Sequence, residues 1–290
     1  MKAVPGAGGR LLVGRAAGGS LAWAAADVTA IIEEARRRLD FSPLAASACG
    51  RALAGAALLL RLARKPTDRL VLEIRGDGPL RLVIAEVDAE GNLRGMVGQP
   101  KVDLPPTAAG KPPVGQGIGK GLLRVHREQD GASYQSQVAL VTGEIGSDLA
   151  HYLEQSEQTQ SAVLVGVLAK PDGVAAAGGM IVEVLPGAKE DAITALESNI
   201  RDLGGVSRRL EEEGLAGLSE RLLSGLDPEL GEERPLRYRC RCSRERLRQH
   251  LIVLSADDRE HLRHEDGTTE AECVFCGEIY RFDAAELRPD

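Results

Sequence analysis

The sequence predicts an α+β fold: a core domain with antiparallel sheets and packed helices, a helical linker, and a small C-terminal domain with four cysteines. Three observations support this. Apolar and polar residues alternate with a period of two in several runs after residue 69, turn residues separate these runs, and four of the five cysteines follow residue 239. Hairpin-linked strands with few helices are typical of α+β rather than of alternating α/β folds.

The first elements are short strands followed by helices. Strands are expected at Leu11 to Ala17 and at Leu21 to Ala26, and Asp27 can cap a helix that runs through Ile31 to Leu39. Ser42 and the proline after it then open a second helix.

This second helix is expected to end near Lys65-Pro66 and is apolar nearly all round, so we predict that it is central to the core. Cys49 lies within it, where a free cysteine is usually a small buried hydrophobe, and we assign it no chemistry. No apolar run approaches the ~18 residues of a membrane span, which predicts a soluble protein.

A strand meander follows from Arg69. Leu70, Leu72 and Ile74 alternate with more polar residues, Asp77-Gly78 signals a hairpin, and a further turn leads to a third strand at Leu93 to Val97. Later strands are expected at Leu122 to Glu128, Tyr134 to Val141, Ser161 to Leu168 and Met180 to Leu185, with a short helix at Ile145 to Glu157.

The glycine-rich run Gly115 to Gly121 does not fit a phosphate-binding loop. Gly121 stands where Ser or Thr should bind magnesium, and a strand-like segment follows instead of a helix. We interpret it as a flexible loop.

Charge divides the chain into residues 1–185, 186–234 and 235–290. The middle stretch is acidic, with 6 basic and 12 acidic side chains. Ile193, Leu196, Ile200 and Leu203 recur at helical spacing before Gly204-Gly205, and shorter helical pieces follow at 206–213 and 218–223. Helices this short are only marginally stable in isolation, so the stretch either packs against a neighbouring part of the protein or is a solvated linker.

The four C-terminal cysteines form two close pairs, Cys240-x-Cys242 and Cys273-x-x-Cys276. Two such pairs are typical of a four-thiolate Zn²⁺ site. The alternatives are a disulfide framework, which is usual in short cysteine-rich secreted chains, and a thioredoxin-like redox pair, which normally lies in a βαβ pattern. A unit of 56 residues also needs a metal or disulfides because it cannot bury enough surface.

The remaining chemistry is sparse. His261 and His264 lie beside glutamates, as expected of a solvated surface, and no HExxH or nucleophile motif is present. A closed zinc site leaves no position for a reactive water, so we expect no enzyme activity. The formal charge of −7 gives no global basic field for nucleic acid, and free thiols without an export signal predict a cytoplasmic protein.

Arginines crowd the first cysteine pair, and four aromatic residues are expected to pack around the metal. Cations near a zinc–thiolate group of net charge −2 would stabilise it. The same residues would also suit RNA, which keeps a zinc-ribbon RNA-binding factor as an alternative. The arginines are Arg237, Arg239, Arg241, Arg244, Arg246 and Arg248, and the aromatics are Tyr238, Phe275, Tyr280 and Phe282.

With these motifs, the sequence resembles the redox-regulated 33 kDa chaperonin family (heat-shock protein 33). The resemblance is carried by Cys240-Arg-Cys-Ser-Arg-Glu-Arg246, the thirty residues between the pairs and Cys273-Val-Phe-Cys-Gly277. Three blocks of the amino-terminal part match in the same order: Arg75-Gly-Asp-Gly-Pro79, Tyr152 with Ser156-Glu-Gln158, and Ala177-Gly-Gly-Met180.

The resemblance implies a core and dimerisation domain at 1–185, a metastable client-binding linker at 186–234 and a zinc-binding redox switch at 235–290. It implies a chaperone that holds unfolded client proteins without ATP and is inactive when reduced and zinc-bound. Oxidation would then form disulfides Cys240–Cys242 and Cys273–Cys276, release zinc and favour a homodimer. No membrane or nucleic-acid partner is expected, and an oxidoreductase that uses Cys273 and Cys276 is the weakest alternative.

Overall fold

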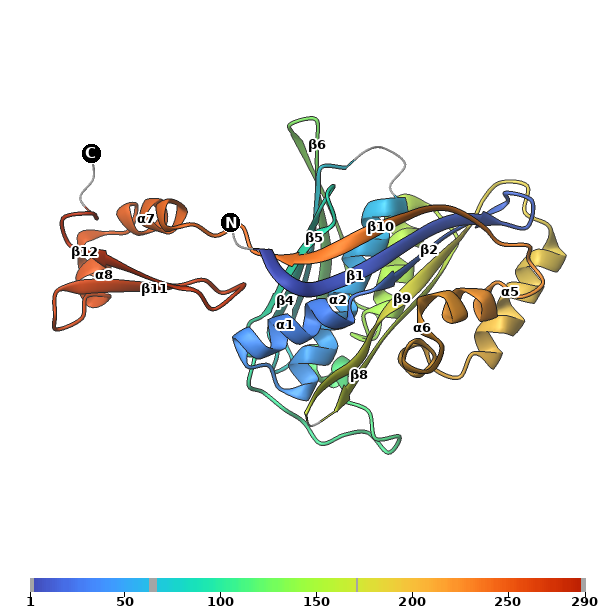
Figure 1. The fold of residues 1–290 in the computed structure, drawn as a ribbon, viewed down its shortest axis with the longest axis horizontal. Coiled ribbons are helices and arrows are strands. Elements are labelled where there is room, and N and C mark those ends of the chain that lie inside the picture. The colour runs from blue at the N-terminus through green and yellow to red at the C-terminus, as the bar shows by residue number, and fades with distance from the viewer. Residues whose placement is uncertain (1–2, 63–66, 171, 288–290) are drawn as a thin grey trace.

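The computed structural model describes residues 3–62, 67–170 and 172–287. Its main feature is a curled ten-stranded sheet with helices on both sides (Figure 1). The strands, in chain order, are β1 (Ala3–Ala16), β2 (Leu21–Asp27), β3 (Arg69–Gly76), β4 (Leu82–Asp88), β5 (Asn92–Val97), β6 (Gly121–Gln129), β7 (Ala132–Ala139), β8 (Ser161–Lys170), β9 (Gly173–Val184) and β10 (Glu229–Arg239).

Their spatial order is β7-β6-β3-β4-β5-β10-β1-β2-β9-β8. Neighbouring strands are antiparallel except for β5 and β10, which run parallel over two residue pairs. The predicted meander is confirmed as β3-β4-β5. The structure therefore has the mixed architecture of strands and helices that the sequence predicts.

The half of the sheet around β1 and β2 is buried on both faces. Side chains alternate between the faces of a strand, so Leu11 and Ala24 belong to one apolar cluster and Leu12 and Trp23 to another. The half around β3 is covered on one face only, because Leu70, Leu72 and Ile74 are buried whereas the residues between them are not.

Helices α1 (Thr29–Leu39) and α2 (Pro43–Leu62) fill the inside of the curl, where α2 packs against strands of both halves. Ser42 caps α2 as predicted, since its Oγ accepts a hydrogen bond from the Ala45 amide at 3.1 Å. Asp27 does not occupy the cap position of α1, but its carboxylate accepts the amide of Thr29 at 2.9 Å. The predicted helix end at Lys65-Pro66 lies outside the described residues.

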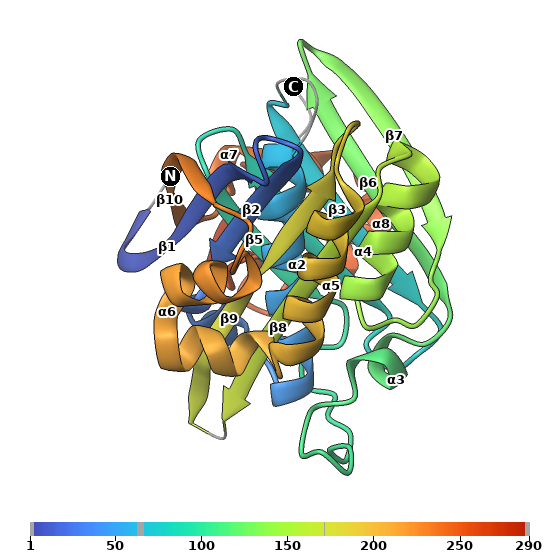
Figure 2. The same ribbon diagram turned by 90° about the vertical axis from the view of Figure 1, so that its right-hand side faces the viewer.

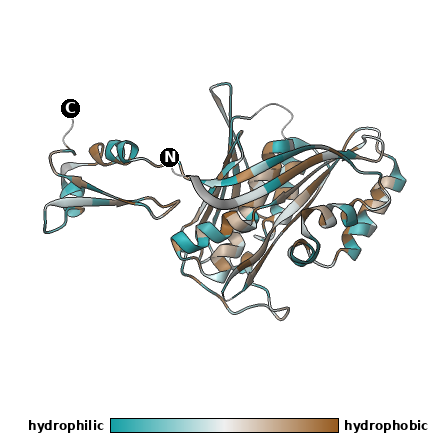
Figure 3. Cartoon of the chain, viewed as in Figure 1, coloured by the Kyte–Doolittle hydropathy of each residue, from teal (hydrophilic) through white to brown (hydrophobic). Residues whose placement is uncertain are grey.

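The expectation that no apolar segment reaches the length of a membrane span is wrong for α2. Within the described residues, Pro43–Arg61 is long and apolar enough to cross a membrane by length and composition. Its 18-residue window is 89% buried inside the protein, as expected for the central core helix that the sequence predicts. Figure 3 shows the contrast between this apolar helix and the hydrophilic outer turns of α1.

The acidic middle stretch forms two helices, α5 (Glu190–Asp202) and α6 (Val206–Leu222), which we call the linker helices. They cover the face of the sheet opposite α2 (Figure 2). Their buried leucines pack against β2 and β9, so this stretch is not a solvated linker. Residue Gly214 has a non-helical backbone inside α6, which separates the two helical pieces that the sequence predicts.

Several segments differ from the sequence prediction, among them the start of β1, which begins at Ala3 rather than at Leu11. The glycine-rich run contains a short helix, α3 (Val114–Ile118), and β9 begins at Gly173 rather than at Met180. The predicted helix at Ile145 to Glu157 is divided into α4 (Gly146–Tyr152) and a π-helical turn, η1 (Leu153–Glu157). Alanine and glycine obscured the start of β9 because they give little alternation in polarity.

The C-terminal module, residues 240–287, stands at one end of the molecule (Figure 1). It contains α7 (Arg244–Ile252), α8 (Ala256–His261) and the hairpin of β11 (Thr268–Glu272) and β12 (Ile279–Asp283). Strand β10 crosses the boundary predicted at residue 234 and pairs with β1 and β5, so the chain passes through the core sheet before it enters the module. The three-part division of the chain stays a prediction.

Candidate metal centre

The first cysteine pair lies directly after β10. Leu236, Tyr238 and Cys240 are buried in alternation with more exposed arginines, so the period of the strand directs Cys240 inward. Cys242 follows after the end of the strand, outside regular secondary structure. Ser243 then begins α7, because its Oγ accepts a hydrogen bond from the Arg246 amide at 3.3 Å.

The second pair occupies the turn between β11 and β12. The carbonyl of Cys273 accepts the amides of Cys276 at 3.1 Å and of Gly277 at 2.8 Å, and the Cys273 amide donates to the carbonyl of Glu278 at 3.0 Å. Gly277 has a φ of +69°, a conformation that glycine adopts without strain. A Cβ there would lie 3.0 Å from the carbonyl oxygen of Arg38, so the turn approaches α1 closely.

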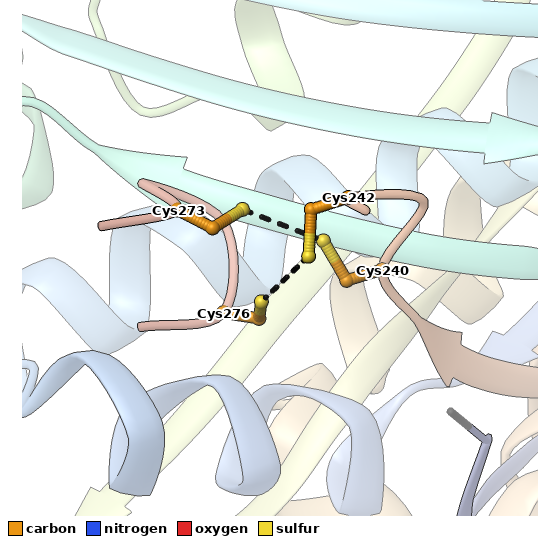
Figure 4. A group of neighbouring side chains, drawn as sticks. All are labelled: Cys240, Cys242, Cys273 and Cys276. Carbon is orange, nitrogen blue, oxygen red and sulfur yellow. Dashed lines mark hydrogen bonds between the residues drawn. The ribbon is translucent and has the colours of Figure 1, made fainter. Parts of the chain in front are cut away.

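The two pairs face one another, and their sulfurs converge (Figure 4). The Sγ atoms of Cys240 and Cys273 are 3.6 Å apart and those of Cys242 and Cys276 are 3.5 Å apart. All four sulfurs lie within 4.8 Å of one another, and none is in a disulfide. Cys242 is partly exposed and the other three are buried.

This arrangement fits one tetrahedral metal ion. Sulfurs that each lie ~2.3 Å from a shared Zn²⁺ would be about 3.8 Å apart. This distance is close to the separations of 3.5 and 3.6 Å between the facing sulfurs and below the 4.8 Å that bounds all four. Four thiolates are also the donor set that structural zinc sites use. Within the described residues, one group of three or more potential ligands lies close enough together to hold a metal ion, and it consists of these four cysteines.

Contact between the sulfurs perturbs their pKa values. The pKa of Cys240 is lowered because the thiols of Cys273 and Cys276 donate hydrogen bonds to its sulfur. The same bonds raise the pKa of Cys273 to about 11 and raise that of Cys276 as well, because each must keep its proton to donate it. A divalent cation at the centre would offset the repulsion that opposes ionisation of all four.

Aromatic residues and an arginine surround the sulfurs. The hydroxyl of Tyr238 donates to the carbonyl of Phe275 at 2.8 Å, and the hydroxyl of Tyr280 lies 3.3 Å from the sulfur of Cys242. Arg94 Nη1 on β5 lies 3.8 Å from the sulfur of Cys240. The prediction that the aromatics pack around the metal is not met by the fourth, because Phe282 packs in a separate small cluster in the module.

Sequence reasoning missed Arg94 because it lies about 150 residues before the cysteines and belongs to an ordinary strand. Of the arginines around the first pair, Arg241 pairs with buried Glu86, whereas Arg244 and Arg248 bind the carboxylate and the carbonyl of Glu286, which follows β12. To predict the position of Arg94, one would need to know that β5 pairs with β10 and in which register.

The other candidates take no part in the cluster. His261 and His264 are exposed, and His261 contacts the carbonyl of Asp257 on its own helix, as expected of a solvated surface. Cys49 is fully buried in α2, and burial raises the pKa of its thiol to about 12. It therefore stays protonated and has the hydrophobic role that the sequence predicts.

Comparison with known proteins gives a family for this arrangement. Residues 10–283 match the family model described as Hsp33 protein. The chain belongs to the Hsp33 family. Among curated relatives of this Hsp33-family chain, it is 47% identical to a 33 kDa chaperonin of Thermus thermophilus, over 97% of this chain and 86% of that protein.

Further relatives of this Hsp33-family chain agree over nearly its whole length. A 33 kDa chaperonin of Symbiobacterium thermophilum is 43% identical over 93% of both chains. The crystal structure of the 33 kDa chaperonin from Thermotoga maritima superposes with a TM-score of 0.87 at 35% identity and covers 96% of each chain. The resemblance stated from sequence motifs is thereby confirmed.

Proposed function

We propose that this protein is a redox-regulated, ATP-independent chaperone that holds unfolded proteins. It is inactive when reduced and zinc-bound, and oxidation of Cys240, Cys242, Cys273 and Cys276 activates it. Membership of the Hsp33 family supports the chaperone role. The convergence of four sulfurs within 4.8 Å of one another supports the regulation, because one ion can bind all four and an oxidant can reach the partly exposed Cys242.

The proposed oxidation forms Cys240–Cys242 and Cys273–Cys276. Formation of each disulfide removes two electrons from a pair of thiolates, and hydrogen peroxide that accepts them, together with two protons from the solvent, becomes two waters. When bound, zinc joins the two loops and keeps their thiolates ionised. Pairing within each loop removes all four ligands, so the metal no longer joins the two loops.

Loss of the metal would unfold the C-terminal module. Metal binding contributes on the order of 10 kcal/mol to the folding of small zinc modules. The apolar cluster of this module is small, since its buried members are Leu251, Phe282 and Leu287. Without the ion it cannot bury enough surface to offset the conformational entropy of folding.

In this proposal, the linker helices provide the surface that binds client proteins. Residues 223–228 join the end of α6 to strand β10, which ends directly before Cys240, so disorder in the module reaches the linker through this strand. Release of α5 and α6 exposes their apolar face and the face of β2 and β9 beneath it, while the acidic outer residues keep the complex soluble. Figure 3 shows both kinds of residue on these helices.

The remaining assignments are part of the same proposal. The partners are unfolded client proteins and a second copy of the chain when oxidised, and the compartment is the cytoplasm. We assign no catalytic residue, and we propose no membrane or nucleic-acid partner.

The test is light scattering from a guanidinium-unfolded client diluted into buffer with either form of the protein. We expect the peroxide-treated protein to suppress aggregation and the reduced protein not to. A zinc-sensitive dye should report about one ion per chain before oxidation and none after it. Cys49→Ala is the matched control, because it removes a thiol outside the cluster and should leave both results unchanged.

The proposal is wrong if the protein loses its zinc, forms both disulfides and still fails to suppress aggregation. A steeply salt-dependent association of the reduced protein with single-stranded RNA would favour the zinc-ribbon alternative instead.

A further inference from the structure

The cysteine cluster lies at the junction between the module and the core. Cys240, Cys273 and Cys276 belong to the main apolar cluster of the core, together with Tyr238, whereas the module has its own separate apolar cluster. The core therefore forms one wall of the candidate metal centre. One side chain of the core contacts residues of both cysteine loops there.

That side chain is Arg94, at the middle of β5. Its Nη1 lies 3.8 Å from the sulfur of Cys240 in the first loop. Its guanidinium carbon lies 4.2 Å from the ring centroid of Phe275, which stands between the two cysteines of the second loop. Stacking of a guanidinium on an aromatic ring and donation to an anionic sulfur are both favourable, and here one group does both.

A buried carboxylate fixes Arg94 in this position. Arg94 donates through Nε and Nη2 to Oε2 of Glu86 on β4, at 3.0 and 2.7 Å. Only 7% of the Glu86 side chain is exposed, and its other oxygen forms an ion pair with Arg241 at 2.5 Å and accepts a hydrogen bond from Arg69 at 3.3 Å. A buried carboxylate needs such partners, so the pairing orients the guanidinium groups.

Arg241 links the same carboxylate to the first loop, because it stands between Cys240 and Cys242. Glu86 thus binds one arginine from the core that reaches the sulfurs and one from the cysteine loop itself. Arg94 and Arg241 carry two positive charges against one carboxylate, beside a zinc–thiolate group of net charge −2. The charges are complementary across the junction.

We propose that Arg94 is a positioning residue of the cysteine site, and that the cluster of Glu86, Arg94 and Arg241 holds the module against the core in the reduced protein. Arg94 lowers the electron density on the Cys240 sulfur by hydrogen bonding and holds the two loops in register through Phe275. This slows the oxidative loss of metal. The proposal rests on the proposed function only in taking the four sulfurs as ligands of one ion.

The test compares Arg94→Met and Arg94→Lys in the full-length reduced protein with Zn²⁺ or Co²⁺ alone as the probe. Loss of a hydrogen-bonding partner of a metal ligand weakens metal binding by about tenfold or more, and we expect that loss for Arg94→Met in competition with a chelator. The thiolate absorption of bound Co²⁺ should move to longer wavelength, because the sulfur becomes richer in electrons. A purely structural defect would lower occupancy without moving the band.

Arg94→Lys keeps the positive charge beside Glu86 but loses the planar group that stacks on Phe275, so we expect a smaller loss of affinity. Arg94→Lys also keeps the proposal testable if Arg94→Met does not fold. Arg75→Met is the matched control, because Arg75 lies on β3, its side chain is 60% exposed, and within the part of the chain that the structure describes its ion pair is with Glu73. It should bind metal as the wild type does.

Wild-type metal affinity and an unshifted cobalt spectrum in both Arg94 variants would overturn the proposal. Neither readout involves a client protein. A protein that failed to suppress aggregation but still showed the Arg94 effects would therefore contradict the proposed function and leave the role of Arg94 intact.

Discussion

The linker helices and the C-terminal module are neighbours in the sequence, but different forces hold them in place. Helices α5 and α6 and the residue that ends α5 bury a row of leucines in the apolar cluster beneath them: Leu196, Leu203, Leu210, Leu215, Leu218 and Leu222. The module buries few apolar side chains of its own and depends on a sulfur cluster and a charged contact with the core. An oxidant acts on sulfur and not on leucine, so a chemical signal can reach the module directly and the linker only through it.

The largest loss of stability should follow from the removal of one cysteine sulfur. Cys276→Ser removes one ligand, and we expect loss of most bound zinc and unfolding of the module, since the metal accounts for on the order of 10 kcal/mol of its stability. Hydrogen exchange read by mass spectrometry should show loss of protection in 244–283, while α2 and β3 stay protected.

Cys49→Ala is the control for loss of a buried thiol. Full protection of 244–283 in Cys276→Ser would contradict the idea that metal binding holds the module.

A smaller effect is expected in the linker. Leu218 is 1% exposed on α6, and Leu218→Ala should cost about 2–5 kcal/mol because it leaves a cavity against the sheet. We expect faster hydrogen exchange in 206–222 with zinc content unchanged, and weak suppression of client aggregation even by the reduced protein.

Glu220→Ala lies on the exposed side of the same helix and should change none of these. Release of zinc by Leu218→Ala would show that the linker helices also hold the metal centre in place, and the comparison would fail.

The smallest effect should come from the turn that touches α1. Gly277→Ala places a methyl group 3.0 Å from the Arg38 carbonyl at a φ of +69°, and should cost roughly 1–3 kcal/mol in thermal unfolding of the module. Gly267→Ala is a matched control, because its φ is +82° but nothing lies within 4 Å of the added methyl group.

The two variants share the backbone strain, so the difference between them measures the contact with the core. Equal unfolding temperatures would show that the close approach to α1 contributes nothing.

Local patterns were enough to predict most elements of the core. Leu70, Leu72 and Ile74 have the period of two that β3 shows, and Ser42 caps the helix it precedes. The cysteine pairs were equally visible, because metal-binding loops are encoded by spacing within a few residues. The structure brings all four sulfurs together as their spacing suggests, whereas zinc binding itself stays a prediction.

Contacts between distant segments were not predictable in this way. In the sequence, strand β10 resembles a charged linker because its exposed side carries glutamate and arginine. The alternation of Leu236, Tyr238 and Cys240 was the sequence pattern that could have predicted the strand. Arg94 gave no signal at all. Its role depends on β5 lying beside β10, which no local pattern specifies.

The position of β10 has a consequence for biosynthesis. This strand lies between β1 and β5 and joins the two halves of the ten-stranded sheet, yet it is made after every other strand of that sheet. A nascent chain that has emerged only as far as residue 228 must therefore keep two strand edges apart, each open to pairing with another chain. The ribosome releases the segment that closes them almost together with the cysteines, so the sheet and the sulfur cluster are completed in the same late step of translation.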